Sequence, residues 1–407
     1  MVIAIPVEIA HIIMAYVADK GSLANLLLVS HAFRLLAEPL LYYDVSFLAP
    51  FRQDRGGWGQ SEGRSDADIS AVANSFLHGI TAGGGVCARY VKRIYLPGVA
   101  FRGAQYALFQ SILQSTPNLE DLQVHFAWWM EAIELLDLRA FFTGPRSRCS
   151  SPPFALKTFA WYTPDVQPSS LGLGWFLSTQ KSLERLLLPN LVAESCPPFL
   201  PTLPRLRVLH ASTIVVAKQF RKANQVTHLM LERGPMGLDA AGFVDVVVCV
   251  ARRSSLHEVS AAMAWMPRLE CLEIDTSRSP IPKTLSRVGA LKGAAKLRHL
   301  RFFPNQVLLE SEAFHSHPWD YGDVANIFNT LPSLTHVSFL LSPAPTNYCE
   351  YCCFIKGSAR PVKLRALRPQ VSKDDLYEWW DDWIEDYAVV PFEPSDPRMG
   401  YQGDLLS

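Results

Sequence analysis

One short hydrophobic pattern recurs through most of the chain. An apolar residue is followed by two variable residues, a second apolar residue, one variable residue and a third apolar residue. Side chains alternate along a strand, so the fourth and sixth positions of this phrase face the same side. The phrase therefore predicts nine short strands, spaced 20 to 43 residues apart, which start at Val91, Leu119, Leu156, Leu183, Leu206, Val226, Leu269, Leu297 and Leu334.

The segments between the phrases have a helical period in places, and we predict helices over 101–115, 238–253 and 323–330. In the widest gap, Leu256 and Val259 resemble an incomplete extra copy of the phrase. Proline disfavours helix in the residue before it, so a proline just ahead of a phrase ends the preceding helix and starts an extended segment. Four phrases are introduced in this way, by Pro117, Pro204, Pro267 and Pro332.

A strand, a helix and a proline-led return to the next strand are typical of a leucine-rich repeat. One such unit cannot bury its apolar face alone, so neighbouring units stack and their parallel strands line one side of a solenoid. We therefore expect an α/β fold built around an irregular leucine-rich-repeat solenoid. The uneven spacing leaves an ordinary α/β domain with leucine-rich strands as the alternative.

The first forty-odd residues carry a different pattern, that of short helices. Pro6 suits the first turn of a helix, and Glu8 complements the positive end of its dipole. Apolar residues from Ile9 onward recur at helical spacing, and Gly21 is expected to end this first helix.

A second helix is expected from Ser22, with Leu26 and Ser30 on one stripe. A third helix begins near Ala32 and is expected to break before Pro39. Three short helices with this much apolar surface imply a partner or a covering domain.

The order of these elements resembles the F-box. The residues that carry the resemblance are the proline–glutamate start at Pro6 and Glu8, the Val-Ser-x-x-Phe-Arg element at 29–34, and the Glu-Pro-Leu-Leu-Tyr ending at 38–42. Ile5 stands where the family usually has a leucine before the proline, a change that keeps size and apolarity. The resemblance covers roughly residues 3–47, about a tenth of the chain.

This resemblance implies that the segment docks a substrate receptor onto the Skp adaptor of a cullin-based ubiquitin ligase. In the family, a following leucine-rich-repeat solenoid selects the protein to be ubiquitinated. Ile9 and Phe33 have an alternative place in the core of the module, and the whole segment has an alternative role as a helical hairpin that caps the solenoid. The implied docking positions are Pro6, Glu8, Ile9, Leu26, Val29, Ser30, Phe33, Leu40 and Leu41.

Composition and charge narrow the range of partners. Hydrophobic residues make up 49% of the 407 residues and charged residues 19%, which indicates a folded chain with a large core. The 38 basic residues balance 38 acidic ones, so nucleic acid is not expected as the principal partner. No apolar run reaches the length of a membrane span, and the apolar start lacks the features of a signal peptide. Eight scattered cysteines indicate reduced thiols in the cytosol or nucleus.

No motif points to bond chemistry. Cys349, Cys352 and Cys353 invite a zinc site, but a structural site needs four ligands and no second cysteine pair exists. His336 or the pair at 315 and 317 would have to complete it. The glycines at 83–85 lack the lysine and hydroxyl residue of a phosphate-binding loop. We therefore expect no enzyme, cofactor or metal, with a dispersed active site as the remaining alternative.

The segment 373–387 near the end has a helical period with seven acidic residues. Trp379, Trp380 and Trp383 fall on one stripe of this helix. A cap that covers the last repeat is the favoured interpretation. The alternative is an acidic and aromatic interface for a basic partner, because tryptophan often anchors interfaces.

These observations predict four parts: an F-box-like helical module at 1–48, a connector and first helix at 49–86, a degenerate solenoid at 87–345, and a C-terminal helical cap and tail at 346–407. The predicted function is substrate recognition in a Skp–cullin–F-box ligase, with the Skp adaptor, the cullin complex and an unknown protein substrate as partners. A scaffold without a ligase role is the alternative. The target itself is not encoded in any pattern of this single sequence.

Overall fold

The computed structural model divides the chain into two compact units. The N-terminal unit comprises residues 1–52, 56–209 and 222–225, and the C-terminal unit comprises the rest. The structure describes residues 9, 13–14, 20–48, 66–101, 103–125, 134–143, 151–162, 166–197, 201–221, 225–232, 243–251, 259, 266–275, 288–303, 321–343, 348–357, 362–367 and 389–390.

The N-terminal unit starts with two helices, α2 (Lys20–Leu26) and α3 (His31–Tyr43). Helix α2 includes Gly21 and Ser22, so the predicted helix boundary there is wrong. Ser30 caps α3 instead of extending the preceding stripe, because its Oγ accepts a hydrogen bond from the Phe33 backbone N–H at 3.2 Å.

The predicted break before Pro39 is also wrong, since Pro39 lies inside α3. Proline lacks the N–H that would bond to the carbonyl four residues earlier. Here that carbonyl belongs to Leu35, which is exposed, so water can satisfy it. The helix therefore continues to Tyr43.

Five strands of the N-terminal unit form a parallel sheet in the order β1, β2, β3, β5, β7. In this pairing, the fourth residue of each phrase lies opposite the fourth residue of the next phrase. The fourth residues in β2, β3, β5 and β7 are fully buried. The strands are β1 (Asp44–Ser46), β2 (Arg93–Pro97), β3 (Asp121–His125), β5 (Thr158–Trp161) and β7 (Arg185–Leu188).

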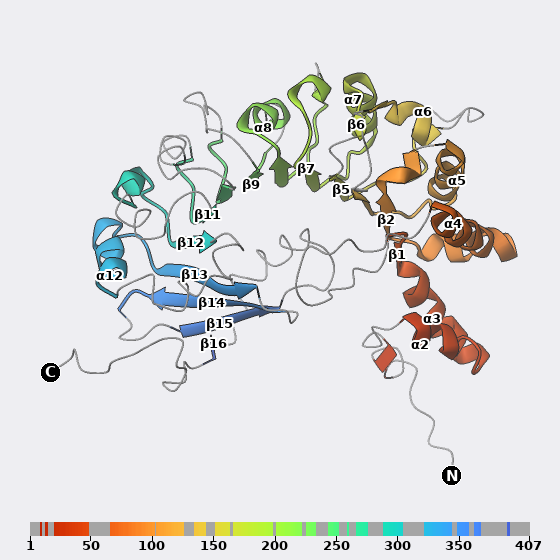
Figure 1. The fold of residues 1–407 in the computed structure, drawn as a ribbon, viewed down its shortest axis with the longest axis horizontal. Helices are drawn as coiled ribbons and strands as arrows, with labels where there is room; N and C mark the ends of the chain where they lie inside the picture. The colour runs from red at the N-terminus through yellow and green to blue at the C-terminus, as the bar shows by residue number, and fades with distance from the viewer. Residues whose placement is uncertain are drawn as a thin grey trace, which may run out of the picture. The chain divides into compact units, whose positions relative to one another are not determined.

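Helices α5, α6 and α7 lie on the same side of these strands (Figure 1). The helical elements of this unit also include α4 and four short 3-10 turns, η1 to η4. Two further strands, β4 (Glu134–Leu136) and β6 (Val166–Pro168), pair with each other in a separate parallel ladder. The helices are α4 (Asp66–Thr81), α5 (Gly103–Gln114), α6 (Leu138–Thr143) and α7 (Ser170–Thr179), and the turns are η1 (Ala82–Gly84), η2 (Cys87–Tyr90), η3 (Gly98–Phe101) and η4 (Ala193–Ser195).

The core of this unit is rich in aromatic rings. Phe142 stacks on Phe176 at 4.5 Å between ring centroids, and Phe176 also contacts Phe159 at 4.8 Å. Phe101 contacts Trp161 at 5.0 Å. Phe159 and Trp161 are the fourth and sixth residues of one phrase, so the residues that define the repeat pack directly against the helices.

The C-terminal unit repeats the arrangement with a second run of parallel strands, in the order β9, β10, β11, β12, β13. Strand β8 (Val208–Ala211) lies at the division between the units. The elements are β9 (His228–Leu231), β10 (Val248–Ala251), β11 (Cys271–Asp275), β12 (His299–Phe303), β13 (His336–Pro343), α8 (Ile214–Arg221), η5 (Val288–Gly293) and α12 (Tyr321–Thr330).

The parallel run ends in antiparallel strands. Strand β14 (Tyr348–Ile355) pairs with β13, β15 (Val362–Leu367) with β14, and β16 (Val389–Val390) with β15. Figure 1 shows β13 to β16 side by side in blue.

All nine predicted phrases form strands, which confirms a mixed α/β fold with mostly parallel strands of leucine-rich-repeat type. Helices α5 and α12 confirm the predictions over 101–115 and 323–330. The helix predicted over 238–253 is wrong, because 248–251 form β10.

The widest gap contains a whole extra phrase, Val246-x-x-Cys249-x-Ala251, while Leu256, where the incomplete copy was expected to start, lies outside the described residues. Its strand pairs with β9 and β11 in the same register as its neighbours. All six residues from 246 to 251 are apolar, so hydrophobic period alone does not separate strand from helix.

Candidate partner-binding surfaces

The N-terminal helices bury a small apolar core. Met14, Leu23 and Ala37 are buried together. Five partly buried leucines pack against them: Leu26, Leu27, Leu36, Leu40 and Leu41. Three of the predicted docking residues, Leu26, Leu40 and Leu41, therefore hold the module together as well as reaching its surface.

Other apolar side chains of this module point into solvent. Leu28 is 81% exposed and Val29 64% exposed, and both lie in the turn between α2 and α3. The turn is held by backbone bonds from the Leu28 N–H to Asn25 O and from the Val29 N–H to Leu26 O. Phe33, one turn into α3, is also exposed. We call Leu28, Val29 and Phe33 the turn surface.

The predicted docking residues thus divide by environment. Val29, Phe33 and Ile9 are exposed, while Ser30 is the cap of α3. Sequence reasoning missed Leu28 as a surface residue, because an apolar residue inside an apolar run looks like core. Pro6, Glu8 and the three tryptophans Trp379, Trp380 and Trp383 lie outside the described residues.

A second surface is the face of the sheet formed by the third, fifth and seventh positions of each phrase, which we call the strand face. The fourth and sixth positions point to the opposite side, toward the helices. The third positions of β1, β2, β3 and β7 are Asp44, Arg93, Asp121 and Arg185, and all four are half-buried. Ionised side chains thus alternate in sign across neighbouring strands β1, β2 and β3.

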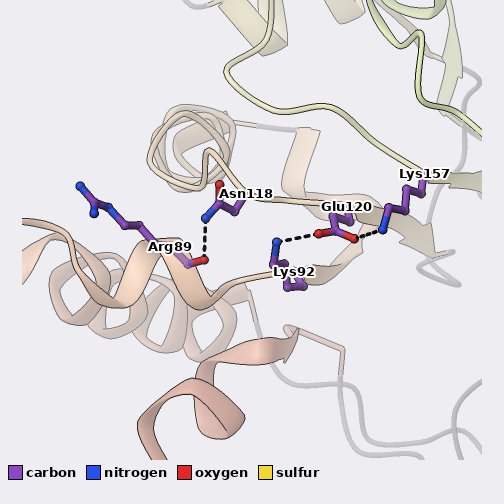
Figure 2. Close-up of polar contacts among 5 residues, drawn as sticks. All are labelled: Arg89, Lys92, Asn118, Glu120 and Lys157. Atoms are coloured by element: carbon purple, nitrogen blue, oxygen red, sulfur yellow. Dashed lines mark hydrogen bonds and ion pairs between the residues drawn. The ribbon is translucent and has the colours of Figure 1, made fainter. Parts of the chain in front are cut away.

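Charged side chains also alternate in sign at the second positions of the phrases, next to the start of the strands. Figure 2 shows Glu120 between Lys92 and Lys157, with both Nζ–Oε distances at 2.6 Å. Hydrogen bonds from Lys157 and Lys92 lower the pKa of Glu120, and Glu120 raises the pKa of Lys157. These side chains are 31–54% exposed, so solvent screens them and each pair contributes at most about 1 kcal/mol. The pairs favour the observed order of β2, β3 and β5.

In the same region, the Asn118 side chain donates a hydrogen bond to the backbone carbonyl of Arg89 at 2.9 Å (Figure 2). Asn118 belongs to the proline-led segment that introduces the second predicted phrase. The bond ties that segment to η2, so it helps to fix where β3 begins relative to β2.

Aromatic rings continue the strand face of the N-terminal unit. Tyr95 lies 5.9 Å from His125, and His125 lies 5.0 Å from Tyr162, between ring centroids. Burial lowers the pKa of His125 to about 4, so this ring is neutral at pH 7. The Gln123 side-chain oxygen is 3.2 Å from His125 Nε2.

The strand face of the C-terminal unit carries buried polar pairs. Arg301, 1% exposed, donates from Nη1 to Glu273 Oε2 at 3.1 Å, and the two residues hold the fifth positions of β12 and β11. His210 Nε2 lies 2.8 Å from Glu232 Oε1. Buried charges are tolerated only when they are paired, so these contacts fix side chains that simple strand patterning leaves open.

Histidines occupy neighbouring third positions in this unit. His299 and His336 stack at 4.6 Å between ring centroids. Burial, and then the neighbouring His336 and arginines, lower the pKa of His299 to about 4. Thr335 Oγ1 lies 2.9 Å from His336 Nδ1, which orients that ring.

The candidate zinc cysteines fall on β14, in an extended strand. Burial raises the pKa of the Cys353 thiol. Within the described residues, no three His, Cys, Asp or Glu side chains gather closely enough to hold a metal ion. None of the described helices has the length and apolar character needed to cross a bilayer.

Comparison with known proteins identifies no family. No family model matches the chain, and no curated protein matches it. A solved structure of an LRR protein from Leptospira interrogans aligns with 61% of this chain and 90% of its own length, at 10% identity and a TM-score of 0.17. A TM-score this low supports no conclusion, so the repeat fold rests on the strands described above.

Proposed function

We propose that this chain is a protein-interaction scaffold that acts as the substrate receptor of a Skp–cullin–F-box type ligase. The N-terminal helices would dock a Skp-type adaptor, and the repeats would hold a target protein. The chain performs no bond chemistry in this proposal, because its contribution is to raise the effective concentration of the target near the transferring enzyme.

The turn surface is the observation that carries the proposal. Leu28 and Val29 of this small helical module are exposed to water, beside an exposed Phe33. Burying these apolar side chains against an apolar partner would be favourable. Val29 and Phe33 are also docking positions implied by the F-box resemblance, so exposure and resemblance converge on them.

The test uses the full chain with a purified Skp-type adaptor and its cullin, measured by titration calorimetry and co-elution. Val29→Asp should weaken adaptor binding by at least about tenfold, because it places a charge in an apolar contact. The matched control is Val215→Asp, a similarly exposed valine on α8, which should bind like the wild type. Circular dichroism must show that both variants keep the helical content of the wild type.

The residues inside the module provide a second control. Leu26→Ala removes packing from the buried core, so it should lower stability as well as binding. Failure of the folded wild type to bind the adaptor would overturn the ligase proposal, as would equal loss in both valine variants. Adaptor binding without recruitment of the cullin would leave a scaffold without a ligase role.

A further inference from the structure

Helices α6 and α7 form a pair that the repeat pattern does not require. Each of them follows a strand of the separate β4–β6 ladder and not a strand of the main sheet. The two halves of this pair are also joined at Ser169, whose backbone N–H bonds to the Leu136 carbonyl at 2.8 Å. The ladder therefore fixes where both helices begin.

The starts of the two helices are in close contact. The Ser169 hydroxyl accepts a hydrogen bond from the Gly172 N–H at 3.1 Å, which caps α7. Oδ1 of Asp137 accepts from the Arg139 N–H at 2.9 Å at the start of α6. A Cβ atom at Gly172 would lie 3.0 Å from the backbone N of Leu138 and 3.1 Å from Asp137 Oδ1, so the absence of a side chain permits this approach. The outer side chains of the two helices are thus held near one another.

The outer face of α7 is apolar and open to water. The helix contains no charged residue. Leu171 and Trp175 lie one turn apart on this face, with Leu171 77% exposed and Trp175 half-buried. A surface helix usually has polar side chains on its outer face, so an exposed apolar face indicates contact with a partner. The opposite side of α7 is buried through Gly172, Leu173, Phe176 and Leu177.

Arg139 of α6 places a positive charge beside this apolar face. The side chain is exposed, and its guanidinium carbon lies 5.9 Å from the centre of the Trp175 ring, within the range of a cation–π contact. Among the described residues, the guanidinium forms no ion pair and no hydrogen bond. A guanidinium that rests on a ring keeps N–H donors along its edges, and their geometry matches a carboxylate.

We propose that α6 and α7 bind an acidic segment of the target protein. A carboxylate of that segment pairs with Arg139, and a neighbouring apolar side chain packs on Leu171 and Trp175. This rests on the proposed function, in which the repeats hold a target protein. Charge complementarity selects an acidic segment, and tryptophan and arginine are the residue types that most often anchor such contacts.

The test observes Trp175 by ¹⁹F NMR in the full chain labelled with fluorotryptophan, with its resonance assigned from Trp175→Phe. The probe is the peptide acetyl-Leu-Glu-Leu-Leu-Glu-Leu-amide, and the control peptide has glutamine in place of each glutamate. The acidic peptide should shift the Trp175 resonance and leave that of the fully buried Trp161 unchanged. The glutamine peptide should bind about fivefold more weakly, the loss expected for one exposed ion pair.

Matched variants separate this surface from other exposed side chains. Arg139→Gln should lower affinity for the acidic peptide about fivefold, whereas Arg205→Gln, at another exposed arginine, should leave it unchanged. Leu171→Ser should lower it at least about threefold, whereas Leu35→Ser, at a 58% exposed leucine of α3, should not. Circular dichroism must show that all four variants keep the helical content of the wild type.

Equal binding of the two peptides would overturn the inference, as would no shift of the Trp175 resonance with the acidic peptide. Unchanged affinity in Arg139→Gln or Leu171→Ser would do the same. A Trp175 resonance that shifts with protein concentration alone, and no longer does so in Leu171→Ser, would identify a second copy of the chain as the occupant and overturn the inference. The adaptor takes no part in these measurements, so failure here is distinguishable from failure of the ligase proposal.

Discussion

Replacing Phe47 with alanine should loosen the N-terminal helices from the sheet. Phe47 directly follows β1 and is 1% exposed. Its ring meets Phe76 of α4 edge-on at 5.4 Å and Phe109 of α5 at 5.1 Å. Its backbone N–H also bonds to the carbonyl of Tyr95 at 3.1 Å. One side chain thus joins the end of the N-terminal helical segment to two helices of the repeats.

The expected cost follows from the contacts that are lost. Truncating a buried phenylalanine to alanine costs about 3–5 kcal/mol. The two edge-on ring contacts account for about 1–3 kcal/mol of that total, at roughly 0.5–1.5 kcal/mol each. Phe47→Leu keeps most of the apolar volume and loses mainly these ring contacts. Its cost should therefore be about 1–3 kcal/mol, clearly below that of alanine.

Hydrogen exchange followed by mass spectrometry measures both variants in the folded chain. The opening free energies of α3, β1 and β2 should fall in the order wild type, Phe47→Leu, Phe47→Ala. Strands β11 and β12 of the C-terminal unit serve as the internal reference and should keep their protection. Equal costs for leucine and alanine, or unchanged exchange in α3, would refute the role assigned to the ring.

Three further outcomes are expected. Glu273→Gln should cost about 3–5 kcal/mol in urea unfolding, because it leaves the charge of Arg301 buried without its anion. Asp121→Asn should flatten the pH dependence of stability. The folded pKa of Asp121 lies above the unfolded value, so the native state holds the extra proton and wild-type stability falls as pH rises from about 4 to about 6. Val246→Asp should unfold the C-terminal unit because Val246 is fully buried. Val247→Asp, at the half-buried second position of the phrase, should cost about 1 kcal/mol or less. Equal thermal shifts in the two variants would contradict the register of β10.

Much of the fold could be predicted because the phrase fixes the three positions that must be apolar. Every predicted phrase became a strand, and its fourth residue faces the helices. Two of the strands that were missed show the limit of that rule. The phrase Tyr42-x-x-Val45-x-Phe47 lies at the end of the segment that resembles the F-box, and the one starting at Val246 lies in a run too apolar to show a period.

The partner-binding surfaces were less predictable, for a physical reason. Their side chains occupy the variable positions of the phrase, which the hydrophobic pattern does not constrain. Glu273 and Arg301 are 28 residues apart and meet only because β11 and β12 pair in one register. Arg93 and Asp121 meet in the same way across β2 and β3. Pairings of this kind follow from the exact strand alignment, which the uneven repeat spacing conceals.

The join between α3 and β1 connects the two surfaces. Asp44 is both the C-cap of α3 and the first residue of β1, so the helix runs into the sheet without a linker. The Tyr43 carbonyl accepts a bond from the Lys92 N–H at 2.9 Å, and Arg93 lies over the Tyr43 ring. The turn surface at Val29 is therefore carried by a helix whose far end is built into the strand face. The distance between an adaptor bound at the turn surface and the sheet is thus set by α3 and not by a flexible connection.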